Sequence, residues 1–150
     1  MNLDNTVDLL WVLICAILVF LMQAGFMCLE AGCTRNKNNI NTALKNICDF
    51  GICMLAFWAC GYGLMFGNSL SGFVGTSDFL FLSKSPQAGA WFIFQAGFCG
   101  AAITIVSGAV AERLKFSMYL VISAIGAIFL YPLVGHWIWN DSGWLSQLGF

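Results

Sequence analysis

The sequence predicts an all-α integral membrane protein with four transmembrane helices. The 150 residues are 60% hydrophobic and only 9% charged, whereas soluble domains carry about 25% charged residues. Four apolar runs are each long enough to cross a hydrocarbon core of about 30 Å, because a helix rises about 1.5 Å per residue. Five of the six Lys and Arg residues lie in the two polar segments that follow the first and third runs.

The first two spans are expected at about residues 9–32 and 44–66, on either side of a polar loop that contains Arg35, Lys37 and Lys45. Gly63 and Gly67 form a GxxxG pattern near the end of the second run, which is a weak signal for close helix packing.

Residues 67–87 are rich in Gly and Ser, and Lys84 is their single basic residue. The apolar stretch at residues 79–82 within them is too short to span a membrane, so we expect it at the membrane interface.

The third span is expected at about residues 88–110. Small residues recur at every fourth position and predict a ridge that a neighbouring helix can approach closely: Ala96, Gly100, Thr104 and Gly108. Phe94 and Phe98 lie beside this ridge, one helical turn apart. A smooth packing edge with a ring pair beside it is typical of a pore-lining helix. The alternative is that both rings face lipid or fill the core.

The fourth span is expected at about residues 116–139, with a kink near Pro132 because proline lacks an N–H donor. Four tryptophans near the expected ends on one side suggest an aromatic belt: Trp91, Trp137, Trp139 and Trp144. Because basic residues accumulate in cytoplasmic loops, residues 34–46 and 111–116 are predicted to be cytoplasmic. The N-terminus and residues 67–87 are then outside.

Polar residues at membrane depth are costly and therefore informative. Glu30, Asp49 and Glu112 fall at the expected cytoplasmic ends of the spans, where they are expected to pair with basic neighbours or to accept helix-end N–H bonds. Those basic neighbours are Arg35, Lys45, Arg113 and Lys115. His136 is expected to bond at the lipid headgroup level. Gln95 is expected to cap a backbone group or to line a vestibule.

Composition and motifs exclude several function classes. The low charge argues against a nucleic-acid partner, which needs a basic patch. Seven cysteines without a CxxC spacing, together with a single His, argue against a disulfide framework, a metal site or a metal cofactor; the cysteines are expected to be small core residues. No P-loop, GxSxG or HExxH motif supports an enzyme.

Three blocks of the sequence resemble the ammonium transporter family, which includes the Amt, Mep and Rh proteins. The blocks are FLMQAGFMCLEAGCTRNKN at residues 20–38, FQAGFCGAAITIVSGAVAERLKF at residues 94–116 and YPLVGHWIW at residues 131–139. They resemble the first span, the third span with its following loop, and the outer end of the fourth span. Together they extend the resemblance over essentially the whole chain.

The resemblance implies an eleven-span fold built from an inverted repeat, of which these residues are the N-terminal part, in a multi-pass protein of the cell membrane. It implies that Phe98 and Trp139 flank an outer ammonium-binding site, and that Phe94 and Phe98 are the ring pair that closes the pore. It also implies ammonium or ammonia as substrate, a homotrimer for the full-length protein and a cytoplasmic regulator of the PII type.

The family also has features that this chain does not include. Its two pore histidines lie in the fifth and tenth spans, and its important aspartate starts the fifth, so all three would lie beyond Phe150. We therefore expect an incomplete N-terminal segment of a channel-like ammonium transporter that does not conduct alone. Two alternatives remain open, namely the ammonium-sensing membrane domain of a signalling protein and an unrelated four-helix membrane protein.

Overall fold

The structure is a computed structural model that describes residues 3–83 and 85–149. Four long apolar helical segments in it are long enough to cross a membrane, which confirms the predicted fold class. In chain order the α-helices are α1 (Leu3–Cys33), α2 (Asn39–Ala56), α3 (Tyr62–Phe66), α4 (Pro86–Val110), α5 (Phe116–Ile125) and α6 (Tyr131–Trp139). Short 3-10 turns cover Asn36–Asn38 and Ser146–Leu148, and two short strands are β1 (Ser69–Leu70) and β2 (Val74–Gly75).

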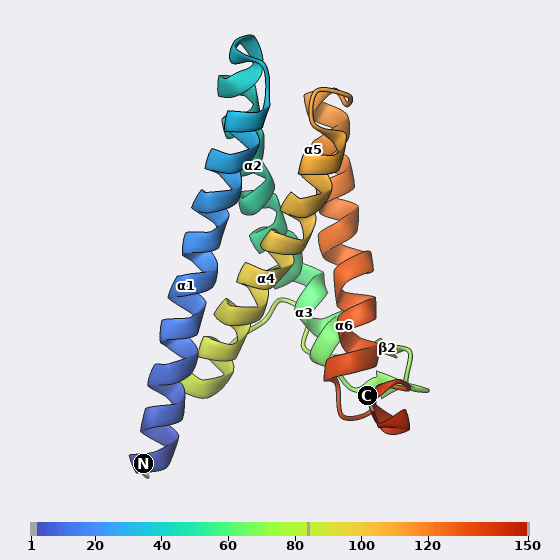
Figure 1. Ribbon diagram of the computed structural model, residues 1–150. Helices are drawn as coiled ribbons and strands as arrows, with labels where there is room; N and C mark the ends of the chain where they lie inside the picture. Colours follow the sequence, from blue (N-terminus) through green and yellow to red (C-terminus); the bar gives the residue numbers. More distant parts are fainter. Residues whose placement is uncertain (1–2, 84, 150) are drawn as a thin grey trace.

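The helical segments run alternately up and down, so the connecting turns gather at two opposite ends (Figure 1). The end that carries the turns at residues 34–38 and 111–115 is called the turn end below. The other end carries the N-terminus, the β1–β2 hairpin and residues 140–149, and is called the hairpin end. This arrangement brings the two loops that carry most of the basic residues to the same end of the molecule.

Local chemistry explains where α4 begins. The Ser85 side chain accepts a bond from the Ala88 N–H at 3.2 Å, and Pro86 occupies the first turn, where its missing N–H costs nothing. By contrast, α2 begins at Asn39, a few residues before the start expected from hydropathy. Its polar first turns pack inside the bundle, since Thr42 and Asn46 are both buried.

The second and fourth spans each contain one π-helical turn, at Phe57–Gly61 and Gly126–Leu130. The second of these turns ends two residues before Pro132, in the region where a kink was expected, because a proline cannot supply the N–H of a regular α-turn. The two π turns pack against each other. A Cβ atom added to Gly61 would lie 2.8 Å from the carbonyl oxygen of Ala127, so only glycine fits this approach.

The small-residue ridge of α4 packs as predicted at three of its four positions. Ala96 and Thr104 are buried, and a Cβ atom added to Gly100 would lie 2.9 Å from the Phe50 ring of α2. Gly108 has no neighbour within 4 Å of such an atom. The ridge therefore stops short of the turn end.

The loop at residues 67–87 is more ordered than its composition suggested, because it contains the β1–β2 hairpin, in which Ser69 pairs with Gly75. The GxxxG pair packs against this loop instead of against a helix: a Cβ atom on Gly67 would lie 2.6 Å from the carbonyl oxygen of Ser77. A Cβ atom on Gly75 would in turn overlap the carbonyl oxygen of Gly63. Lys84 lies outside the described residues.

The stretch at residues 79–82 is bound to the bundle through Phe81, and its location at the membrane interface remains a prediction. The Phe81 N–H donates to the Trp58 carbonyl at 3.2 Å. Its ring centroid lies 4.4 Å from that of Tyr62 and 4.6 Å from that of Phe92. Together with Phe57, these rings form an aromatic core at the hairpin end, called the ring cluster below.

The seven cysteines fall into three burial classes, of which Cys15, Cys48 and Cys60 form the partly buried one. Cys53 and Cys99 are fully buried in the core, as expected for small apolar side chains. Cys28 and Cys33 are exposed on the described bundle, so the prediction that all seven are core residues is wrong for these two. All seven are free thiols.

Candidate functional site

The two phenylalanines predicted to form the gate contact each other on α4. The ring centroids of Phe94 and Phe98 are 4.9 Å apart and the rings meet edge to face, an arrangement that aromatic pairs favour. The Trp91 ring lies 5.5 Å from Phe94 and extends the row toward the hairpin end. Phe94 and Phe98 are half-buried, so each presents part of its ring to the outside of the four-helix segment.

Trp139 lies at the last turn of α6 and is 51% exposed. Its ring centroid is 6.2 Å from that of Tyr131, and the Tyr131 hydroxyl donates to Gln95 Oε1 at 3.0 Å. Gln95 therefore bonds a side chain of the neighbouring span instead of capping a backbone group.

Phe98 lies midway along α4, whereas Trp139 lies at the hairpin end of α6, and the Tyr131–Gln95 bond links the two spans. Tyr131 was not singled out from the sequence, because its partner lies 36 positions away. The assignment of Phe98 and Trp139 to a binding site remains a prediction.

Toward the turn end, a chain of hydrogen bonds joins three helices. The Gln23 amide of α1 donates to the Thr104 hydroxyl of α4, which donates to Asp49 of α2 at 3.1 Å. Asp49 is fully buried, and Cys53 Sγ also donates to it at 3.6 Å. These bonds join the three helices inside the bundle, where an unpaired polar group is costly. Within this set, Gln23 Oε1 has no partner among the described residues.

Glu30 lies closer to the turn end and is also held by neutral donors. Ser107 of α4 and Asn46 of α2 each donate to its carboxylate at 2.8 Å. The expectation that Glu30 and Asp49 pair with basic residues is therefore wrong. The distant hydroxyl and amide groups reach these carboxylates inside the bundle, whereas Lys45 lies over the Tyr119 ring at 4.9 Å.

Glu112 does form the predicted ion pair, with Arg35 at 3.2 Å across the two turns of the turn end. Asn38 also donates to Glu112, at 2.6 Å. The hydrogen bond from Asn38 and the contact with Arg35 lower the pKa of the Glu112 carboxyl below its ordinary value. Glu112 has a φ of 60°, the left-handed conformation with which helices commonly end and which non-glycine residues adopt at some cost.

His136 is fully buried and forms its hydrogen bonds within the protein. Nδ1 lies 2.8 Å from the Met65 carbonyl and Nε2 lies 2.9 Å from the Ser69 hydroxyl. A carbonyl only accepts, so Nδ1 carries the proton and Nε2 accepts from Ser69. His136 therefore fastens the β1–β2 hairpin to α6.

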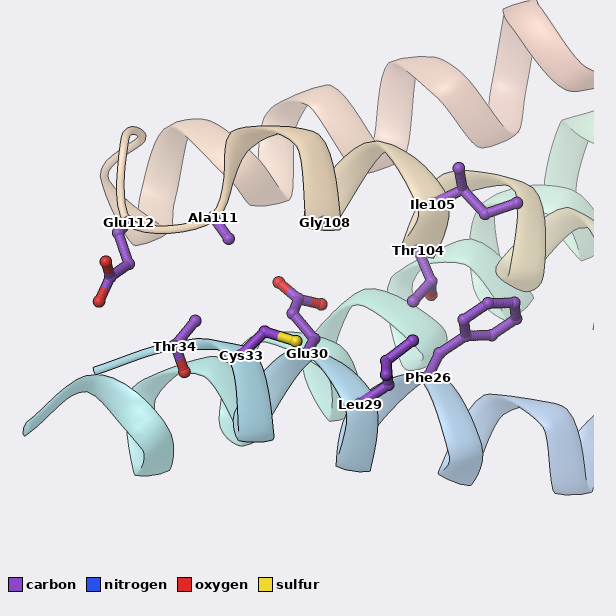
Figure 2. A pocket seen from close by; sticks show the side chains of 10 residues that line it. All are labelled: Phe26, Leu29, Glu30, Cys33, Thr34, Thr104, Ile105, Gly108, Ala111 and Glu112. Atoms are coloured by element: carbon purple, nitrogen blue, oxygen red, sulfur yellow. The ribbon is translucent and has the colours of Figure 1, made fainter. Parts of the chain in front are cut away.

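A cavity of about 440 Å³ lies between α1 and α4 near the turn end, and Figure 2 shows the side chains that line it. The carboxylate of Glu30 projects from α1 into the gap between the two helices, and that of Glu112 extends toward Thr34 at the mouth. The full lining consists of Phe26, Leu29, Glu30, Cys33, Thr34, Thr104, Ile105, Gly108, Ala111 and Glu112. Sequence analysis missed this cavity, since it depends on how α1 and α4 cross.

The described part of the chain contains no group of three or more His, Cys, Asp or Glu side chains that is arranged to hold a metal ion. The two ends of the bundle carry different kinds of side-chain group. Aromatic faces are available at the hairpin end, and carboxylates and hydroxyls at the turn end. Both kinds of group attract small cations without covalent chemistry.

The sequence and the fold are similar to those of known proteins. The sequence profile of the Ammonium Transporter Family matches residues 10–150. Ammonium transporter Amt2 of Archaeoglobus fulgidus is 46% identical over 99% of this chain and 32% of its own length. A Synechocystis protein with a proposed ammonium transport function is 51% identical over 97% of this chain and 29% of its own length.

A solved structure described as a sensor Amt protein superposes with a TM-score of 0.91 and 37% identity, over 95% of this chain and 38% of the solved one. The chain thus spans about a third of the length of the proteins it matches. The matches confirm the resemblance indicated by the three sequence blocks. The chain is therefore a membrane protein that belongs to the ammonium transporter family.

Proposed function

We propose that the protein containing this chain moves ammonium or ammonia across the cell membrane as a channel-like transporter. The observation that carries the proposal is the family match over residues 10–150, supported by relatives that are named ammonium transporters. A transporter needs no catalytic residue, and we propose no enzymatic role and no cofactor. The residues described here would form the N-terminal part of the conduction path, which the rest of the transporter would complete.

Phe98 and Trp139 are the proposed outer binding site, and Phe94 with Phe98 the proposed gate. The half-exposed indole of Trp139 supports the first assignment, because aromatic faces attract a cation by about 0.5–2 kcal/mol. The edge-to-face contact of the gate pair supports the second. Packed rings exclude water, so a hydrated sodium or potassium ion would have to lose its hydration shell to pass.

The proposed topology places the N-terminus and the hairpin end outside and the turn end in the cytoplasm. The Arg35–Glu112 pair supports a common side for the two basic loops. Labelling tests the direction: Ser71→Cys should react with an impermeant reagent from outside and Asn38→Cys should not, in a background without native cysteines. The reverse pattern would overturn the topology. A homotrimer and a cytoplasmic PII-type regulator are proposed from the family alone.

A second candidate function is ammonium sensing. The observation that favours it is the TM-score of 0.91 to a structure described as a sensor Amt protein. A sensor needs the outer binding site, but it does not need a continuous path for the bound ion.

Purified full-length protein in liposomes tests both functions. A transporter should alkalinise or acidify the lumen when an ammonium gradient is imposed, faster than empty liposomes, and should take up methylammonium. Saturable ammonium binding without flux would favour sensing. Neither binding nor flux would contradict both functions.

A further inference from the structure

The cavity between α1 and α4 lies on the side of α4 that carries the proposed gate. Phe98 and Ile105 are seven residues apart within α4. Two helical turns bring a side chain back to nearly the same face. Ile105 lines the cavity, so the cavity lies below the ring pair on this face, toward the turn end.

From this position we propose that Glu30 forms a second cation-binding site, which takes a small monovalent cation with N–H donors, such as ammonium. This proposal depends on the proposed function in one respect, namely that ammonium reaches the site by passing the ring pair. The site would lie on the far side of the ring pair from Trp139 and, in the proposed topology, on the cytoplasmic side.

The charge of Glu30 is the first argument. Its side chain is only 8% exposed and its carboxylate projects into the cavity (Figure 2). Both of its protein partners, Ser107 and Asn46, are neutral. Among residues 3–83 and 85–149 no Lys, Arg or His lies within salt-bridge distance of Glu30. The ion pair found there joins Arg35 to Glu112. A carboxylate held in a largely buried position without a counter-ion favours the approach of a cation.

The hydroxyl groups beside Glu30 are the second argument. Thr34 and Thr104 line the same cavity as Glu30, and a hydroxyl oxygen accepts hydrogen bonds from N–H donors. Ammonium is such a donor, whereas sodium and potassium have no N–H group to offer.

Cys33 provides a test that does not depend on transport, because this exposed thiol lines the same cavity. Full-length protein in which Cys33 is the only reactive cysteine would be modified with a cationic and an anionic thiosulfonate of similar size. We expect the cationic reagent to react faster by about tenfold, the lower bound for a charged cleft. Ammonium chloride should slow this reaction more than sodium chloride at the same ionic strength.

Glu30→Gln should remove both the preference for the cationic reagent and the protection by ammonium. Glu30→Asp, which keeps the charge, should retain the preference. Ser107→Ala is the matched control, because it removes a hydrogen bond to Glu30 without changing the charge, and it should also retain the preference. If Glu30→Gln does not fold, protection of Cys33 by ammonium in the parent protein still tests whether the cation site exists.

The outcomes separate this site from the proposed function. Equal rates for the two reagents, no protection by ammonium, or no labelling of Cys33 would overturn the site even if the protein transports ammonium. Protection without any flux would leave the site standing while the transport proposal fails. In a transporting protein, Glu30→Gln should also raise the half-saturating ammonium concentration severalfold for flux that starts from the turn end, and change it less for flux from the hairpin end.

Discussion

The two ends of the bundle are held together by different kinds of contact. At the turn end, polar side chains of three helices bond to one another, as in the chain from Gln23 through Thr104 to Asp49. At the hairpin end, Phe57 is fully buried against Tyr62 and Phe92. Glycines there allow close backbone contacts, and His136 bonds to the Met65 carbonyl and to Ser69.

The difference follows from the solvent that surrounds a membrane helix. Lipid is as apolar as leucine, so burying apolar side chains does little to bring helices together, and association relies on close packing and on interhelical hydrogen bonds. The hairpin end combines packed rings and close glycine contacts with side-chain bonds to loop and backbone groups, whereas at the turn end side chains of different helices bond to one another. The same division recurs in the two proposed cation sites, where the Trp139 indole offers an aromatic face and Glu30 offers a charge.

The hairpin end should be the more sensitive to a single added atom. In Gly75→Ala the new Cβ would overlap the Gly63 carbonyl oxygen and lie 2.9 Å from that of Leu64. Both are backbone atoms that cannot rotate away, so we expect a loss of about 1–3 kcal/mol or more. Unfolding of the purified full-length protein in detergent measures it. Gly51→Ala, at a position with nothing within 4 Å, is the control and should unfold no more easily than the parent.

The turn end should be sensitive to the loss of one hydroxyl. Thr104→Val keeps the side-chain shape but removes the donor to Asp49 and the acceptor for Gln23, at an expected cost of about 1–2 kcal/mol. The same unfolding assay applies. Asp49→Asn keeps an acceptor for Thr104 and should cost less. If Asn costs as much as Val, the charge of Asp49 matters more than its hydrogen bond.

Hydropathy and the distribution of basic residues were enough to predict the four helices and the common end of the two basic loops. These signals are local, since each span is a continuous apolar run and each loop a cluster of charges. The motif blocks were enough to predict the family. An ion pair of Glu112 could also be predicted, with Arg35 as one of four candidate partners, because both residues lie in short turns at the same end.

The partners of buried polar groups could not be predicted, because they are far apart in sequence. Ser107 lies 77 positions from Glu30 and Thr104 lies 55 positions from Asp49. Sequence proximity favoured basic partners, but the crossing of α1, α2 and α4 brings hydroxyl groups closer. The partner of His136 could not be predicted for the same reason, since Ser69 is 67 positions away. The hairpin was missed because its strands have only two residues each, too few for an alternating pattern.

At the proposed outer site, Trp139→Leu should weaken ammonium capture by about 0.5–2 kcal/mol, which is roughly two- to thirtyfold in apparent affinity. The physical reason is the loss of an aromatic face, and the two proteins are compared at equal membrane abundance. Concentration-dependent uptake or current in liposomes measures it. Trp137→Leu is the matched control, because the Trp137 indole donates to the Phe73 carbonyl at 2.8 Å. This substitution should lower stability more than it changes ammonium affinity.

Phe98→Leu separates the gate from the binding site. Replacing the ring keeps most of the volume but removes the edge-to-face contact with Phe94, so potassium exclusion should weaken while ammonium affinity changes less. Normal ammonium kinetics and normal potassium exclusion in both Trp139→Leu and Phe98→Leu would refute the assignment of these residues and leave the fold unaffected.

The smallest expected effect concerns the ion pair that closes the turn end. Because the folded state lowers the pKa of Glu112, its contribution to stability is complete above the ordinary glutamate pKa of about 4.3 and is lost as the pH falls from there toward the folded pKa. The effect should be small and should shrink with added salt, since the pair is exposed. Unfolding of the parent and of Glu112→Gln across this pH range measures it. If both proteins lose stability equally below pH 4.3, the two turns are not joined through Glu112 in solution, and the turn end depends on its buried hydrogen bonds alone.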